Sequence, residues 1–208
     1  TKIFDCPEFL EKYTYDGDDL GATLHDTGTT FKVWAPTASR VVLDLYRAGN
    51  GEAAYAHVDM VREDHGVWSY TADCGHGTYY TYTVTTAVGT QTATDPYGRA
   101  AGLNGDRSMV VDLSRTNPSG WMGDTVFKTG ITSYSDAVIW EVHVRDFSNK
   151  IADSKYKGKY LAFTERGLVN EAGVSVGIDY LMHLGITHVH LLPVYDYATV
   201  DEGNPDAA

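Results

Sequence analysis

Histidine and acidic residues stand two positions apart in two short apolar runs, where they could bind a metal ion or polarise a substrate. His188 and His190 form one pair, and Glu141 and His143 form the other. Alternate side chains of a strand share one face, and imidazole and carboxylate groups are common zinc ligands. No third or fourth ligand stands at metal-site spacing. We therefore expect no metal at the histidines and structural, hydrogen-bonded roles for Glu141 and His143.

The lysines and glycines could in principle bind phosphate. Four lysines lie among tyrosines and glycine in the segment 149–172, and Gly49-Asn50-Gly51 is glycine-rich. No glycine-rich fingerprint leads from a strand into a helix at either place. We expect a solvated loop in the first case and a turn in the second.

Aromatic rings are the other residues with an obvious chemical use, because 4 Trp and 15 Tyr are many for 208 residues. Such rings can stack on the C–H face of a sugar, although they also pack the cores of β-proteins. Trp34, in an alternating run beside Pro36, is expected in a core or an interface. Trp68 follows a turn and is expected to be the more exposed of the two. The predicted sugar-binding residues are Trp68, Tyr80 and Tyr97.

Composition restricts the partners. The chain has 16 Lys and Arg against 28 Asp and Glu, a net charge of -12, which opposes nucleic acid and anionic membranes as partners and leaves neutral polar ligands. Cys6 and Cys74 are the only cysteines, so a disulfide framework is not expected. There is no apolar run of 18 residues and no signal-peptide pattern. These features fit an extracellular protein as well as a cytoplasmic one.

Two patterns of hydrophobic periodicity divide the chain into parts. Short β-type runs separated by turn residues fill residues 20–113, and they predict an antiparallel β-sandwich of the immunoglobulin-like class. The expected strands are 30–34, 40–46, 55–61, 67–72, 79–86 and 108–113. A short helix with Phe9, Leu10 and Tyr13 on one face is expected in the lead-in, residues 1–19. Residues 114–136, with Pro118 and three glycines, are expected to form a linker.

The segment 137–208 has the pattern of a parallel strand, a helix and a second strand. Residues 137–144 are nearly continuously apolar, as in a strand covered on both faces, and residues 186–192 repeat this pattern before Pro193. Between them, Ser175 is a candidate helix N-cap and Gly185 is placed for a left-handed helix end. Arg145 and Asp146 should close the first strand as an ion pair or loop anchor. Two such strands need further strands to bury their faces.

Several motifs resemble a known enzyme family in one colinear order. Those in the first half are Asp16-Gly-Asp-Asp-Leu-Gly21, Phe31-Lys-Val-Trp-Ala-Pro-Thr-Ala38, Asp95-Pro-Tyr97, Asn104-Gly105 and Asn117-Pro-Ser-Gly-Trp121. They are similar to the sandwich module that precedes the catalytic barrel in type I pullulanases. Glu141-Val-His-Val-Arg-Asp-Phe-Ser148, the segment 157–165 and the segment 177–194 resemble the opening of that barrel.

The resemblance implies a carbohydrate-binding module of family 48 followed by the opening βαβ part of a glycoside hydrolase family 13 (β/α)8 TIM barrel. The parent enzyme would hydrolyse α-1,6 linkages of pullulan, starch and glycogen fragments with a carboxylate nucleophile and a carboxylic acid. Those two groups would lie on later barrel strands. We therefore assign no catalytic residue, expect no activity from this chain alone, and expect no cofactor apart from a possible structural calcium ion in the full-length parent.

Two other functions remain open from the residues themselves. A glucan-binding module that acts alone would need only the sandwich, whose expected partner is an α-glucan. A non-catalytic interaction protein would pair the two expected barrel strands with the rest of the enzyme, another copy or a different partner.

Overall fold

The computed structural model describes residues 6–124, 130–195 and 200–204. Parts of the predicted lead-in (1–5), linker (125–129) and barrel segment (196–199 and 205–208) lie outside the described residues. The chain divides into two compact units between Ser119 and Gly120, inside the segment expected to be a linker, and residues 200–204 group with the first unit. No helix among the described residues has the length and apolar character needed to cross a bilayer.

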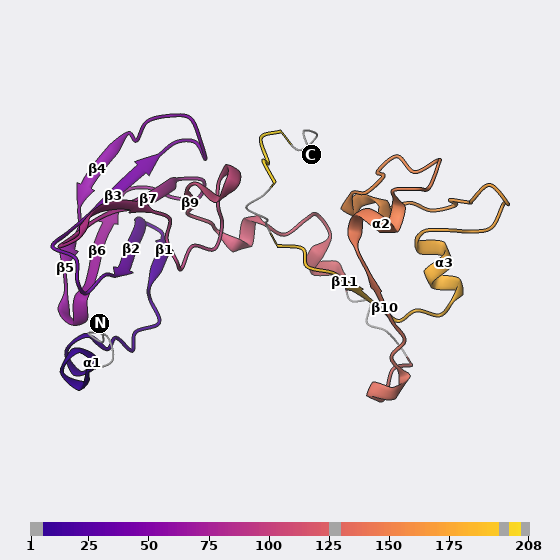
Figure 1. Ribbon diagram of the computed structural model, residues 1–208, viewed down its shortest axis with the longest axis horizontal. Helices are drawn as coiled ribbons and strands as arrows, with labels where there is room; N and C mark the ends of the chain where they lie inside the picture. Colours follow the sequence, from indigo (N-terminus) through magenta and orange to yellow (C-terminus); the bar gives the residue numbers. More distant parts are fainter. Residues whose placement is uncertain (1–5, 125–129, 196–199, 205–208) are drawn as a thin grey trace. The chain divides into compact units, whose positions relative to one another are not determined.

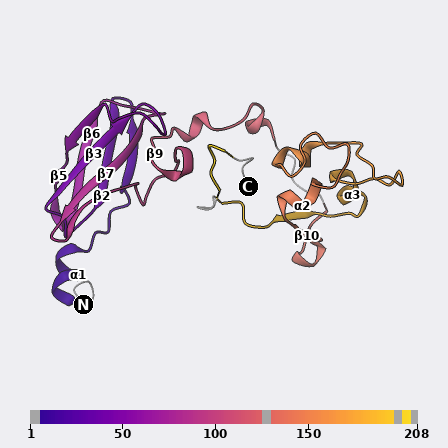
Figure 2. The ribbon, with the colours of Figure 1, turned by 45° about the horizontal axis from the view of Figure 1, so that its top comes forward.

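The first unit is a β-sandwich of two antiparallel sheets (Figures 1 and 2). One sheet has the order β1-β2-β6-β5 and the other β4-β3-β7-β8, with β9 pairing to β7. A short helix, α1 (Pro7–Tyr13), lies at one end of the sandwich in both views. The strands are β1 (Gly21–His25), β2 (Gly28–Trp34), β3 (Arg40–Tyr46), β4 (Ala56–Asp59), β5 (Val61–Arg62), β6 (Val67–Ala72), β7 (Tyr79–Thr86), β8 (Gly89–Ala93) and β9 (Ser108–Met109).

Alternation along the strands builds the core between these sheets. In β3, Val41, Leu43 and Leu45 are buried in the core cluster, and they face Phe31 and Val33 of the other sheet. The side chains between them point to the opposite face, as the two-residue period of a strand requires. Burying these aliphatic and aromatic side chains is the main stabilisation of the sandwich, at about 25 cal/mol per Å² of apolar surface.

The structure confirms the predicted antiparallel sandwich and most of its strands. The predicted strands 40–46, 67–72 and 79–86 coincide with β3, β6 and β7. The predicted strand 55–61 is divided between β4 and β5, and only the first two residues of 108–113 form β9. No expected strand covers β1 or β8. All five residues of β8 are exposed, so this strand lacks the apolar alternation that would have predicted it.

The second unit contains a parallel βαβ arrangement. Strand β10 (Ile139–Val142) pairs in parallel with β11 (His188–Leu191), with Ile139 opposite His188. The connection contains helix α2 (Val144–Ser148), a 3-10 turn at Tyr160–Thr164 and helix α3 (Ile178–His183). A crossover that contains a helix is the usual connection between parallel strands.

Three local predictions for the second unit need correction. The strand expected at 137–144 ends at Val142. Arg145 and Asp146, which were expected to close it, lie in helix α2. Neither forms an ion pair in the described part of the chain. The N-cap position of α3 is Gly177 rather than Ser175, which forms an isolated bridge with Val169. Gly185 has a φ of +73°, as predicted for the residue that ends the helix.

Candidate functional site

The three predicted sugar-binding residues lie in different environments. Trp68 is 6% exposed and belongs to the core, where its Nε1 donates a hydrogen bond to the Ala35 carbonyl at 3.1 Å. Tyr80 is 1% exposed and packs edge-on against Phe31. Tyr97 is 49% exposed. Of the three rings, only that of Tyr97 lies where a sugar could reach it.

Strand register explains why the expectations for two tryptophans are reversed. Val33 of β2 lies opposite Trp68 of β6, and Trp34 lies opposite Val67. Val33 and Trp68 face the core, so their neighbours along each strand face outward. Trp34 is accordingly 38% exposed on the outer face, whereas Trp68 is buried. The alternation of Phe31 and Val33 in the sequence would have predicted this.

Tyr97 borders a small cavity that we call the aromatic cavity. Its volume is about 280 Å³, near the lower end of the roughly 300–1,000 Å³ range of ligand pockets. Four aromatic rings besides that of Tyr97 contribute to it, from α1, the segment after it and β2. The lining residues are Phe9, Tyr13, Thr14, Tyr15, Leu20, Trp34 and Tyr97. The strand pattern does not predict this site, because three of its five rings, those of Phe9, Tyr13 and Tyr15, lie in the lead-in.

Trp34 is fixed by hydrogen bonds at the wall of this cavity. Its Nε1 donates to the carbonyl of Tyr13 at 2.9 Å and to that of His65 at 3.1 Å. His65 has a φ of +59°, and Gly66 follows with a φ of +78°. A Cβ on Gly66 would lie 2.6 Å from Pro36 Cα, so only glycine fits this turn. The turn that was expected to expose Trp68 instead holds Trp34.

A charged network fixes Tyr15, which also lines the aromatic cavity. The Tyr15 hydroxyl donates a hydrogen bond to Asp19, which also accepts one from Lys32 Nζ at 2.7 Å. Hydrogen bonds from Lys32 and Tyr15 lower the pKa of Asp19, whereas the bond to the carboxylate raises the pKa of Tyr15. Glu63 lies 3.6 Å from the same ammonium group. The Tyr15 side chain is therefore held as a neutral phenol.

Asp95 positions Tyr97. One carboxylate oxygen, Oδ1, accepts a hydrogen bond from the Tyr97 backbone N–H at 2.8 Å. The other, Oδ2, accepts one from the Tyr80 hydroxyl at 2.7 Å and a longer one from Tyr82 at 3.4 Å. The Gly98 N–H donates to the Asp95 carbonyl at 3.0 Å and closes a turn. Tyr80 thus helps to support the exposed ring through Asp95, while its own ring stays in the core.

Burial changes the titration of this cluster. It raises the pKa of Asp95, against the opposing effect of the hydrogen bonds from Tyr97, Tyr80 and Tyr82. Burial and the nearby Asp95 carboxylate also raise the pKa of both tyrosines well above their ordinary value. Both shifts favour the protonated phenols, the form in which they donate to Asp95.

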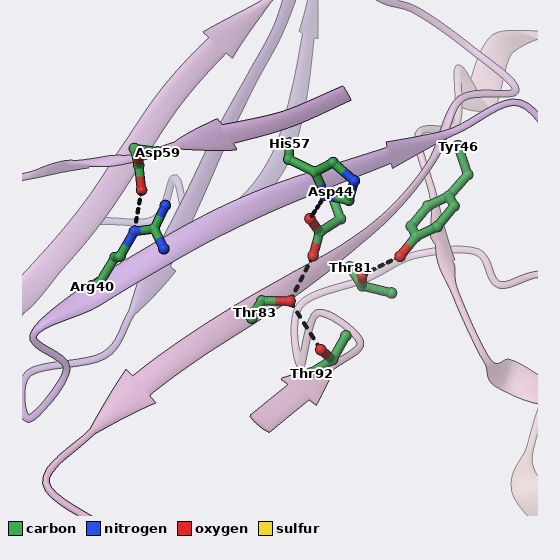
Figure 3. A network of polar contacts seen from close by, with 8 residues as sticks. All are labelled: Arg40, Asp44, Tyr46, His57, Asp59, Thr81, Thr83 and Thr92. Carbon is green, nitrogen blue, oxygen red and sulfur yellow. Dashed lines mark hydrogen bonds and ion pairs between the residues drawn. The ribbon is translucent and has the colours of Figure 1, made fainter. Parts of the chain in front are cut away.

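A polar network covers the outer face of the sheet β4-β3-β7-β8 (Figure 3). Asp44, almost fully buried, accepts hydrogen bonds from Thr83 Oγ1 at 2.6 Å and pairs with His57 Nδ1 at 2.5 Å. Thr83 also contacts Thr92 Oγ1 at 2.9 Å. These groups already satisfy one another, so the face is less prepared than the aromatic cavity to bind a ligand.

The acidic and histidine residues of the second unit do not assemble a metal site. His190 Nδ1 lies 3.2 Å from Glu141 Oε2, and His188 Nδ1 lies 2.8 Å from Thr187 Oγ1. Among residues 6–124, 130–195 and 200–204, no group of three or more His, Cys, Asp or Glu side chains could hold a metal ion. Glu141 is exposed. His143, for which a hydrogen-bonded role was expected, has a buried Nδ1 without a hydrogen-bond partner in this part of the chain.

Comparison with known families places a recognised module on the sandwich. Residues 19–98 match the model of carbohydrate-binding module 48, the isoamylase N-terminal domain. The match includes β1 to β8 and the turn that carries Tyr97.

Individual proteins are similar over nearly the whole chain. A pullulanase of Bacillus subtilis is 35% identical over 95% of this chain and 26% of its own length, and the chloroplastic pullulanase 1 of Arabidopsis thaliana is 34% identical over 92% and 20%. A crystal structure of pullulanase from Paenibacillus barengoltzii, in complex with maltohexaose and α-cyclodextrin, is 42% identical with a TM-score of 0.86, over 97% of this chain and 31% of that one. The chain spans about a fifth to a third of these relatives.

Proposed function

Because this chain corresponds to the N-terminal part of a type I pullulanase and carries a carbohydrate-binding module 48, we propose that it binds α-glucan for a starch-debranching glycoside hydrolase. The whole protein would cleave α-1,6-glucosidic linkages of pullulan and branched dextrins. It would do so by the retaining mechanism, in which one carboxylate attacks the anomeric carbon and a carboxylic acid protonates the leaving oxygen.

The second unit would supply the start of the catalytic domain. This proposal is supported by the parallel pair β10 and β11 and by helix α3 in their connection, an order of elements that (β/α)8 barrels also have. We infer that residues 137–208 open such a barrel and contribute neither the nucleophile nor the acid. Full-length protein should release reducing ends from pullulan, whereas the 208-residue chain should release none. Cleavage of pullulan by the pure chain would refute this assignment of roles.

The aromatic cavity carries the glucan-binding proposal. Tyr97 and Trp34 have half-exposed rings at positions that hydrogen bonds define. The Trp34 ring is held through its own Nε1, and the backbone that carries the Tyr97 ring is anchored by its N–H to Asp95. A pyranose ring has apolar C–H faces that stack on such rings, and rings that are already positioned lose little conformational freedom on binding.

Maltotetraose binding to the 208-residue chain tests this proposal by calorimetry. Tyr97→Ala should weaken binding about tenfold, since an aromatic contact is worth roughly 0.5–1.5 kcal/mol beyond its area and 1.4 kcal/mol is a factor of ten. Tyr55→Ala is the matched control, because Tyr55 is a similarly exposed tyrosine of the same unit that does not line the cavity. No binding by the unaltered chain, or equal loss in both variants, would refute the proposal.

A further inference from the structure

Tyr97 and Leu20 line both the aromatic cavity and a second cavity of about 310 Å³, so the two cavities are neighbours. We call this second one the polar cavity. Both lie within the first unit, so their adjacency does not depend on the second unit. The polar cavity differs from its neighbour in the kind of side chain that lines it, since Asp18, Arg99 and Asp112 border it.

Two of these charged side chains are available to a ligand. Asp18 and Arg99 are exposed, and neither side chain has a hydrogen bond or an ion pair within the described ranges 6–124, 130–195 and 200–204. The third is already engaged, because Asp112 accepts hydrogen bonds from the backbone N–H and hydroxyl of Ser114, which lower its pKa. The polar cavity thus offers a free carboxylate acceptor and a free guanidinium donor.

This combination suits a neutral, hydroxyl-rich ligand. Sugar hydroxyls both donate and accept hydrogen bonds, so they suit a cavity lined by a carboxylate acceptor and a guanidinium donor. A free anion would meet two carboxylates against one guanidinium, on a chain with a net charge of -12. A purely apolar ligand would leave both charged groups without compensation for the water they lose.

We propose that the two cavities are consecutive subsites for one α-glucan chain. One glucosyl unit packs among the rings of the aromatic cavity, and the next places its hydroxyls at Asp18 and Arg99, with Tyr97 between the two units. The inference rests on the proposed glucan-binding function and adds its minimum ligand, which is maltose rather than glucose. Each cavity is too small for a chain of several sugars, so further units would extend into solvent.

Calorimetry on the 208-residue chain with glucose, maltose, maltotriose and maltotetraose tests this proposal. We expect affinity to rise about tenfold from glucose to maltose and to change less than about threefold from maltose to maltotetraose, since only the second unit gains new hydrogen bonds. Equal affinity for glucose and maltose would overturn the proposal, as would a steady rise with every added unit.

Arg99→Gln separates the polar cavity from the aromatic one. The variant should bind maltose at least about fivefold more weakly and glucose with unchanged affinity, since glucose is expected to use the aromatic cavity. Arg47→Gln is the matched control, because Arg47 is exposed and stacks on Tyr55 away from both cavities. If Tyr97→Ala weakens maltotetraose binding and Arg99→Gln leaves maltose binding intact, the two-subsite inference fails while glucan binding stands. If maltotetraose does not bind at all, both fail.

Discussion

In the sandwich unit, alternate side chains of β3 and β7 meet those of the facing sheet, and Leu43, Val41 and Phe31 are fully buried. In the second unit, β10 and β11 pair with each other, yet Ile139 and Val189 remain exposed. The sequence of each region is about equally apolar. The difference shows that apolar strands become a core only where a second layer covers them, as two sheets do for each other.

The same substitution in both units should give the largest contrast. Leu43→Ala removes a fully buried side chain of the sandwich core and should lower its free energy of unfolding by about 2–5 kcal/mol. Leu181→Ala, in α3, also removes a buried leucine but should leave the sandwich unchanged. Amide hydrogen exchange of β7, which reports the unfolding of the sandwich, measures both effects. Comparable losses in β7 would contradict the independence of the two cores.

Asp95→Ala should have the next largest effect, although the residue belongs to a turn. The Tyr80 hydroxyl would lose its buried acceptor, which costs about 1–3 kcal/mol. Urea unfolding followed by circular dichroism measures this loss. Asp73→Ala is the control, since Asp73 is an exposed aspartate of the same unit. Equal stability of the two variants would show that the carboxylate does not support the core.

Trp34→Phe should cost about 0.5–1.5 kcal/mol, because the ring stays but the hydrogen bonds of Nε1 to Tyr13 and His65 are lost. The loss should appear as faster proteolysis of α1, which those bonds connect to the sandwich. Trp68→Phe loses the bond to the Ala35 carbonyl and should destabilise the core without selectively exposing α1. Identical cleavage patterns would contradict this distinction.

A pH dependence should be the smallest effect. Burial raises the pKa of Asp95 in the folded protein, so the folded state holds a proton that the unfolded state releases above about pH 3.9. Its contribution to stability therefore decreases as pH rises from about 3.9 through the raised pKa. Asp95→Asn should remove this slope while retaining an acceptor for Tyr80. Unfolding free energies of both proteins from about pH 4 to 7 measure the difference, and parallel pH profiles would contradict it.

Sequence periodicity was sufficient for the parts of the fold that depend on alternation. The runs 40–46 and 79–86 were predicted to the residue because their inward positions are apolar and their outward ones mostly polar. Strand β8 was not predicted because all its residues are exposed. Its extended conformation is stabilised by pairing with β7 rather than by burial. Helix α2 was not predicted because Val144 continues the apolar run of the preceding strand in the sequence, whereas in the structure the strand ends at Val142 and Val144 begins the helix.

The candidate site was predictable only in part, because it depends on the direction in which each ring points. Residue type alone selected Trp68, Tyr80 and Tyr97, yet type does not decide which way a ring points. The register of β2 with β6 places Trp34 outside and Trp68 inside. The contribution of Tyr13 depends on where α1 lies against the sandwich, which no local pattern in the sequence specifies.

The bond between the Asp95 carboxylate and the Tyr97 amide has a consequence for how this region can change. Surface loops usually tolerate insertions because few interior atoms depend on their length. Here one added residue between positions 95 and 97 would pull the carboxylate away from either the amide or the two phenols beneath it. The turn at residues 95–97 should therefore tolerate inserted or deleted residues as poorly as a strand of the core does.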